Sequence, residues 1–479
     1  MHWFVEQRPD YLGPSEGNVD QTIKVSEPKS AGPPSWLVLG LLLVLVTMVV
    51  AGHVGRYRKF SPIDELQHVD YLLKAPGFEF PGSGDRIGQE AARAETCSRL
   101  DASFDAAVPP CVSAPDTVQV EQLQEQGFNT AYIHPPGFYF VDGVATRILE
   151  AVTFQKIGIL TLARLAGLIW AWLAVVFLWL VFKEFGASTW TAAVGIVLVM
   201  TSGAVISAVS TVNPDGTALA IGAGILWAAA RWERTRRFGW LVVLFAAVAT
   251  ITKFSNIAGV GVALAFLLLP AFKPVMRQFR ASGLKGVWSD RDSKSRIAIA
   301  GASLITIGAL SIGWRVAQAV LQVIPPNELP MSQPTVISSF PLTSFVNSWR
   351  VGVSPLQSPW MASFLGSEWV VASVGIVDLV LVVGAVAGLF LSSAGSKGRR
   401  VAWASIVCSI FLGPFLVAFL FFAQHVSFPV PPRYGLSLVA GLAVSAIPLL
   451  RTKWGFRVAA ALSIFSTAAV LSSITFPAT

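Results

Sequence analysis

Charged residues are scarce in this chain. Only 13% of its 479 residues are Asp, Glu, Lys or Arg and 54% are hydrophobic, whereas an ordinary soluble domain carries about 25% charged residues. The chain therefore has too few charges to cover a water-exposed surface, which excludes a soluble globular protein. Cysteine is also rare, and three cysteines cannot build a disulfide scaffold or a cysteine-rich metal domain.

Long apolar runs, such as Trp36 to Ala51, take the place of the missing charge. Runs of this kind predict helices that cross a bilayer, whereas a β-barrel would show alternating segments of about 10 residues. We therefore predict an all-α polytopic membrane protein. Its eleven expected spans are 35–52, 157–182, 189–209, 216–232, 239–252, 255–272, 297–320, 369–392, 401–423, 434–450 and 458–476.

Basic residues are unevenly distributed between the loops. With the N-terminus inside, most of the 35 Lys and Arg residues fall in inner segments. The short outer loops keep only Lys253, Arg315, Arg350 and Arg433. The positive-inside rule then predicts a cytoplasmic N-terminus. Because residues 1–34 are polar and rich in Pro, Gly and Ser, we expect them to form a disordered tail before a membrane domain at 35–479. Basic residues in the inner loops of a membrane protein explain the net charge of +8, so this charge does not indicate a nucleic-acid partner and we expect none.

Two outer regions, 53–155 and 321–368, are long enough to hold a site. Near the start of the first, Ser61 suits a helix N-cap and Pro62 the first helical position. Apolar residues then recur at helical spacing up to residue 74, which predicts an amphipathic helix lying on the membrane surface. The second region is rich in Pro, Ser and apolar residues, and we expect it to lie against the membrane.

Asp64, Glu65 and His68 are spaced so that they share one face of this helix. Two carboxylates beside a histidine suit a general base or a divalent cation. Asp64 also follows Ser61 by three residues, which is the spacing of the reciprocal residue in a capping box. A structural role therefore explains Asp64 as well as a chemical one, and both interpretations remain open.

Two short motifs mark the outer ends of later spans. His134-Pro135-Pro136 predicts a stiff turn, because a residue before proline is disfavoured in the helical region. For His134, structural and functional roles are equally open. Asn213-Pro214-Asp215 suits the cap of the following helix, and capping alone would explain it.

Three cations, Lys253, Arg315 and Arg433, lie at the predicted outer boundary of the membrane. Charges at this depth are costly unless they are paired or functional, although snorkelling also accounts for each one. Together they would suit an anionic lipid headgroup. Arg433, which precedes Tyr434, is the most distinctive because a guanidinium can bind phosphate in a bidentate manner.

Cys97 and Cys111 both lie in the first outer region, where disulfides persist. A bond between them would close a ring of about 15 residues and contribute roughly 3 kcal/mol in the chain-entropy model. We predict this disulfide, and we expect Cys408, in the middle of a span, to serve packing.

The order of these motifs along the chain resembles the GT-C superfamily of integral-membrane glycosyltransferases. The layout is similar to that of the arabinosyltransferases and mannosyltransferases of the actinobacterial cell wall. The resemblance implies a protein of the bacterial plasma membrane with an extracytoplasmic active site. There it would move a sugar, with inversion, from a polyprenyl-phosphate donor to a glycan or lipid acceptor of the cell envelope.

The resemblance also implies roles for residues. Asp64 would be the general base, and Glu65 would support it or bind a cation. The residues around the substrate and the donor phosphate would be His68, His134, Lys253, Arg315, Arg433 and Tyr434. Whether a divalent cation is needed stays open, with Asp64, Glu65 and His68 as its ligands if one is used. A flippase or transporter of lipid-linked saccharides is the alternative, and it would not need the Asp-Glu pair.

Overall fold

The computed structural model describes residues 34–62, 64–100, 108–111, 118–287, 290–329, 337–357 and 368–475. Within these ranges the regular elements are helices, and the β-structure consists of two isolated bridges. The chain from Ser35 onwards forms one unit. The predicted tail lies outside the described residues, apart from Pro34.

Six helical segments are long and apolar enough to cross a membrane. They are Ser35–Arg56 (α1), Ile159–Glu184 (α5, Ile159–Ala166, with α6, Leu168–Glu184), Phe254–Phe272, Arg291–Leu321 (α12), Lys397–Phe422 (in α17, Lys397–Gln424) and Lys453–Thr475 (α20). A seventh candidate is the pair α7 (Thr189–Met200) and α8 (Gly203–Ser210), bent by 68°. These segments match seven of the predicted spans and agree with a polytopic membrane protein, while the count of eleven stays a prediction.

The other four predicted spans are helical in different ways. They are α9 (Ala218–Thr235), α10 (Trp240–Thr252), α16 (Glu368–Leu391) and a broken series of η11 (Pro432–Leu438), α18 (Val439–Ser445) and α19 (Ile447–Leu450). Most of α9 is buried, because it packs against α6, α10, α11 (Ile257–Val287) and η11. Its Gly222 allows this close approach, since a Cβ there would collide with the carbonyl of Ser437.

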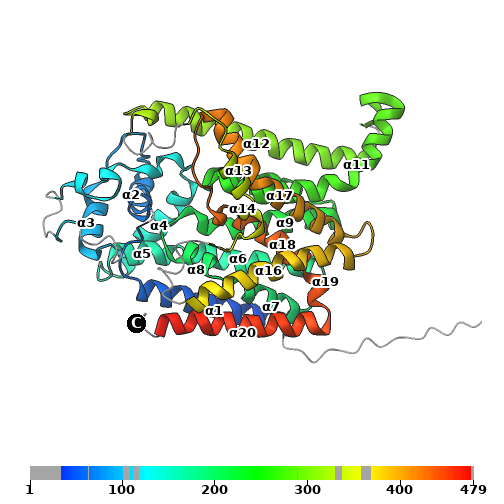
Figure 1. The fold of residues 1–479 in the computed structure, drawn as a ribbon, viewed down its shortest axis with the longest axis horizontal. Coiled ribbons are helices and arrows are strands. Elements are labelled where there is room, and N and C mark those ends of the chain that lie inside the picture. Colours follow the sequence, from blue (N-terminus) through cyan, green and yellow to red (C-terminus); the bar gives the residue numbers. More distant parts are fainter. Residues whose placement is uncertain are drawn as a thin grey trace, which may run out of the picture. The chain divides into compact units, whose positions relative to one another are not determined.

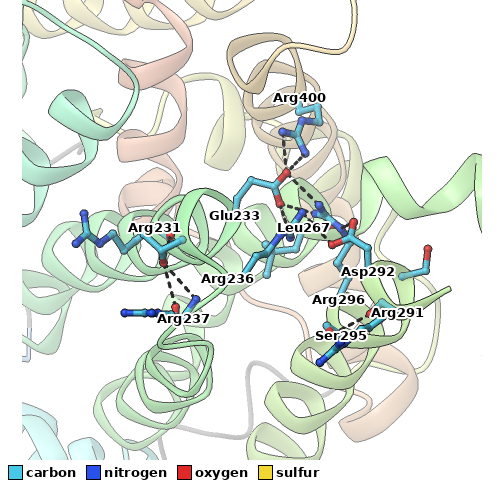
Figure 2. A network of polar contacts seen from close by, with 12 residues as sticks. Arg231, Glu233, Arg236, Arg237, Leu267, Arg291, Asp292, Ser295, Arg296 and Arg400 are labelled. Atoms are coloured by element: carbon cyan, nitrogen blue, oxygen red, sulfur yellow. Dashed lines mark hydrogen bonds and ion pairs between the residues drawn. The ribbon is translucent and has the colours of Figure 1, made fainter.

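A network around Glu233 joins the last turns of α9 to three other helices (Figure 2). Glu233 pairs with Arg296 of α12 at 2.6 Å and with Arg400 of α17 at 3.1 Å. Arg296 also pairs with Asp292 at 2.9 Å and donates to the Leu267 carbonyl of α11 at 3.0 Å. These contacts fix the predicted cytoplasmic ends of α9, α12 and α17 and join them to α11 at Leu267.

Short helices between α1 and α5 gather at one end of the long helices (Figure 1). They include α2 (Glu65–Lys74), α3 (Gln89–Ser98) and α4 (Gly137–Val152), with 3-10 turns at η1 (Ala75–Gly77), η4 (Val120–Gln122), η5 (Gln124–Gly127) and η6 (Thr130–Ile133). A disulfide joins Cys97 in the last turn of α3 to Cys111, as the sequence predicts.

The prediction of a helix on the membrane surface is wrong in two respects. α2 begins at Glu65 rather than near Ser61, and each residue from Glu65 to Leu73 is buried. α3 and α4 pack against it. The polar face of α2 is satisfied inside the protein, where Asp70 pairs with Lys74 at 2.7 Å and accepts from the Asn129 amide at 2.7 Å.

The second outer region is partly inserted among the helices. Its described elements are η9 (Pro326–Glu328), α13 (Leu342–Asn347) and α14 (Arg350–Val353). α14 packs against α17 and η11, and the backbone N–H of Leu356 donates to Asp378 of α16 at 3.1 Å. Residues 330–336 and 358–367 of this region lie outside the described residues.

Candidate functional site

Asp215 is the centre of a buried cluster of charged residues. It lies in η7 (Pro214–Thr217), and its backbone N–H donates to the Asn213 side chain at 2.9 Å, so the predicted cap is present. Its carboxylate, with a side chain 1% exposed, pairs with Lys253 Nζ at 2.6 Å and Arg433 Nε at 2.8 Å. Asn213-Pro214-Asp215 therefore does more than cap a helix, because Asp215 also brings together two cations that are distant in the sequence.

The charges in this trio stabilise one another. Burial by itself would raise the pKa of Asp215, but Lys253 and Arg433 outweigh burial and hold that pKa below its usual value. Burial lowers the pKa of Lys253, and the attraction of Asp215 opposes this shift. With all three groups ionised, the trio carries one net positive charge, which favours an anionic ligand beside it.

Breaks in the helices place the two cations. Lys253 has an extended backbone between α10 and the 3-10 turn η8 (Phe254–Asn256), so its side chain leaves the helix axis towards Asp215. Arg433 lies in η11, which packs against both η7 and η8. The Lys253 ammonium lies 4.7 Å from the ring centroid of Tyr434, within cation–π range.

Asp64 lies at the start of α2 with φ of 54° and makes no capping hydrogen bond with its side chain. The Ser61 backbone N–H, which a capping box would direct to Asp64, donates to Glu65 at 2.7 Å instead, so the capping-box interpretation of Asp64 is wrong. Its side chain is exposed, yet enough protein surrounds it that desolvation raises its pKa, against the attraction of Arg433 and Lys253. Asp64 thus lies within electrostatic reach of both cations in the trio.

The Glu65 carboxylate is fully engaged by hydrogen bonds inside the protein. Its carboxylate accepts from Arg164 Nε at 2.8 Å and Nη2 at 2.6 Å. It also accepts from the backbone N–H groups of Ser61 at 2.7 Å and Val212 at 3.0 Å. Both charged side chains are 1% exposed, so the pair holds the start of α2 against α5 and the chain before η7. No sequence pattern indicates this role for Arg164, because its partner is 99 residues away along the chain.

His68 and His134 lie together beside the trio, with ring centroids 5.5 Å apart. A hydrogen bond of 2.7 Å joins His68 Nδ1 to the Tyr139 hydroxyl, and Tyr139 stacks on Tyr71 at 3.9 Å. Burial, assisted by the positive charge of Lys253, lowers the pKa of His68 to about 3 and that of His134 well below its usual value. Both imidazoles are therefore neutral near pH 7.

Arg315 stands apart from the trio. It is exposed on α12, and the nearby Gln318 donates to the Tyr132 carbonyl at 3.0 Å. Burial raises the pKa of Tyr132, and the positive charge of Arg315 opposes part of this shift. This end of α12 therefore touches the chain just before His134, and Arg315 is not among the ion-pair partners of Asp215.

The residues proposed as metal ligands do not converge. Glu65 faces Arg164, and His68 Nδ1 faces Tyr139. Among the described residues, no group of three His, Cys, Asp or Glu side chains has the arrangement of a metal site. The donor set of Asp64, Glu65 and His68 thus does not fit a divalent cation.

A cleft beside the trio supplies further polar groups. It lies where the start of α2, α8, η7 and η11 meet, and its polar lining residues are Ser61, Glu65, Ser207, Thr211, Asn213, Asp215 and Arg433. The volume of this cleft is about 30 Å³, so it is a small hollow beside Arg433 with room for water molecules and not a substrate-sized pocket.

No protein-family model and no curated protein matches this chain. Among solved structures, the chain is similar to the cryo-EM structure of arabinosyltransferase EmbB from Mycobacterium smegmatis, with 12% sequence identity and a TM-score of 0.35. The match covers 95% of this chain and 43% of that chain, so this chain spans less than half the length of that protein.

Proposed function

We propose that this chain is a membrane glycosyltransferase of the GT-C type. It would move a sugar from a polyprenyl-phosphate donor to an extracytoplasmic glycan or lipid acceptor of the cell envelope. One observation carries the proposal: Asp64, an exposed carboxylate with a raised pKa, lies within electrostatic reach of the two cations held by Asp215. The order of motifs along the chain supports the same assignment.

Asp64 would act as the general base. A sugar hydroxyl is a weak nucleophile, so removing its proton during attack lowers the barrier. The hydroxyl oxygen attacks the anomeric carbon, the bond from that carbon to the phosphate oxygen breaks, and the proton passes to Asp64. Direct attack from the opposite face inverts the anomeric centre. The raised pKa makes Asp64 a stronger base than an ordinary aspartate.

Lys253 and Arg433 would stabilise the departing phosphate. The bond electrons leave with the phosphate oxygen, and positive charge placed nearby in advance favours this separation. Because Asp215 takes the Nε of Arg433, the two terminal nitrogens of the guanidinium would donate to the phosphate. Tyr434 flanks the Lys253 ammonium on another side.

The neighbouring residues would position this machinery. We assign Glu65 a structural role in place of the catalytic or metal-binding role expected from the sequence, because its carboxylate is occupied by Arg164 and two backbone N–H groups. His68 and His134 would offer neutral ring nitrogens to the substrate.

The test is a transfer assay with purified protein in lipid nanodiscs and a panel of polyprenyl-phosphate sugars. Asp64→Asn preserves size and hydrogen bonding but removes the base, so transfer should fall by about 10²–10⁴-fold with donor binding largely retained. The wild-type rate should also fall on acidification, at a pH above the usual range of an aspartate.

Glu121→Gln is the matched control, since Glu121 is an exposed acid in η4, and it should transfer at the wild-type rate. Near-wild-type transfer by Asp64→Asn would refute the base assignment. If the wild type moved lipid-linked saccharides across the bilayer and formed no glycosidic bond, the flippase alternative would replace the proposal.

A further inference from the structure

A second polar cleft lies at the C-terminal end of α6. Its volume is about 510 Å³, in the range of pockets that hold small ligands. It opens between the α6–α7 connection and the α19–α20 connection. The residues that give it chemical character are Gly186, Ser188, Trp190, Arg451, Lys453 and Arg457.

Positive charge dominates this cleft. Its lining holds three cations, Arg451, Lys453 and Arg457, and none of the described lining residues is a carboxylate. The nearby Glu184 is paired instead with Arg234 at 2.5 Å. Three cations in a hollow without a counter-charge create a local potential that favours an anion.

One of these cations is fixed by the backbone. Arg451 Nη2 donates to the Gly186 carbonyl at 2.6 Å and to the Phe185 carbonyl at 3.3 Å. The two connections that form the cleft are therefore held together by Arg451, while Lys453 and Arg457 come from the first turns of α20. The cleft is preformed, and two of its cations belong to a candidate membrane span.

The surroundings of the cleft have the character of a membrane interface. α20 packs against α7 and α19 (Figure 1). Two large aromatic side chains remain exposed here, Trp190 at 54% and Trp454 at 73%, and the Arg457 guanidinium lies 5.5 Å from the Trp454 ring centroid. Exposed tryptophans beside cations at the end of a span are typical of the headgroup level of a bilayer.

We propose that this cleft binds the headgroup of an anionic phospholipid. The phosphate would be held by Arg451, Lys453 and Arg457, and the hydroxyl of Ser188 would meet the polar part of the headgroup. Basic pockets between spans on the cytoplasmic side suit this ligand, because acidic lipids give that leaflet a negative surface potential. The inference is independent of the glycosyltransferase proposal.

Native mass spectrometry of the full chain in detergent tests the proposal. The probes are phosphatidylglycerol, phosphatidylcholine with the same acyl chains, and soluble glycerol 3-phosphate. The key variant is Lys453→Gln/Arg457→Gln, which leaves the backbone contacts of Arg451 intact. Each cation near an anionic lipid contributes roughly fivefold to affinity, so phosphatidylglycerol binding should weaken on the order of 25-fold.

The matched control is Arg291→Gln/Lys294→Gln, which removes two exposed cations from the start of α12, away from the cleft, and should keep wild-type binding. Thermal unfolding confirms that both variants fold. Equal affinity for the two lipids, or an equal loss in both variants, would refute the site. Glycerol 3-phosphate binding as tightly as phosphatidylglycerol would show a site for free phosphate and overturn the lipid assignment.

Discussion

Two adjacent carboxylates, Asp64 and Glu65, have opposite environments. The left-handed backbone at Asp64, with φ of 54°, directs the chain into α2 and leaves the Asp64 side chain exposed. The next residue begins the helix, and its carboxylate is buried against Arg164. A carboxylate with two N–H groups and a guanidinium around it is fully satisfied, whereas the exposed one remains available to accept a proton.

Arg433 allows a prediction about bidentate geometry. Its Nε is used by Asp215, so only the remaining guanidinium nitrogens would reach a donor phosphate. Lysine supplies one point charge and cannot satisfy both partners. Arg433→Lys should therefore reduce transfer nearly as much as Arg433→Ala, by about 10²–10³-fold. Initial rates in the nanodisc assay measure this.

Arg315→Ala is the comparison for this prediction, because Arg315 is an exposed arginine on α12 and is not an ion-pair partner of Asp215. We expect it to transfer at close to the wild-type rate. A collapse of transfer in Arg315→Ala, together with normal transfer in Arg433→Ala, would move the phosphate site to the end of α12.

At the scale of elements, three short 3-10 segments assemble the candidate site. η7 carries Asp215, η8 follows Lys253, and η11 carries Arg433. Each precedes a regular helix, and η11 packs against both of the others. Because the backbone is not regularly α-helical at these points, side chains from sequence-distant helices can meet at one place.

The buried Glu65–Arg164 pair should govern the stability of the connection between α2 and α5. Glu65→Gln leaves Arg164 buried without its counter-charge, so we expect a loss of about 3–5 kcal/mol in the free energy of unfolding. The double variant Glu65→Gln/Arg164→Gln should be less destabilised than the sum of the two single changes. Unfolding in detergent, followed by circular dichroism, measures these differences.

Glu90 offers the matched control, because its ion pair with Arg147 has both side chains partly exposed, at 49% and 37%. Glu90→Gln should cost at most about 1 kcal/mol. If Glu65→Gln cost no more than Glu90→Gln, or if the two buried changes were strictly additive, the pair would not be the structural connection described here.

At the scale of the whole chain, the charged clusters occur at the two ends of the helices. The Asp215 trio is at the predicted outer end, whereas the Glu233 network and the cleft at Arg451 are at the predicted inner end. This separation agrees with the uneven distribution of basic residues and leads to a prediction of orientation.

Single cysteines in a Cys408→Ser background test the orientation. Gln122→Cys, exposed in η4, should react with a membrane-impermeant maleimide in intact cells. Ser393→Cys, exposed between α16 and α17, should react only after permeabilisation. The reverse pattern would invert the proposed topology and place the Asp64 site in the cytoplasm.

The sequence by itself determined the class of the protein and many of its boundaries. Long apolar runs specify helices in lipid, because every backbone polar group must be satisfied within its own segment. The pairing of Cys97 with Cys111 could also be anticipated, because both cysteines lie in the same predicted outer region.

Only the tertiary structure decided which polar residues face one another. Asp215 lies 38 residues from Lys253 and 218 from Arg433, so no helical or strand period connects them. Glu65 and Arg164 are likewise 99 residues apart, so no sequence period connects them. Only their contact shows that Glu65 is buried while the neighbouring Asp64 is exposed. The amphipathic pattern of α2 predicted a helix on the lipid surface, but protein covers this helix. Hydrophobic periodicity shows that a helix has an apolar face and does not identify what packs against that face.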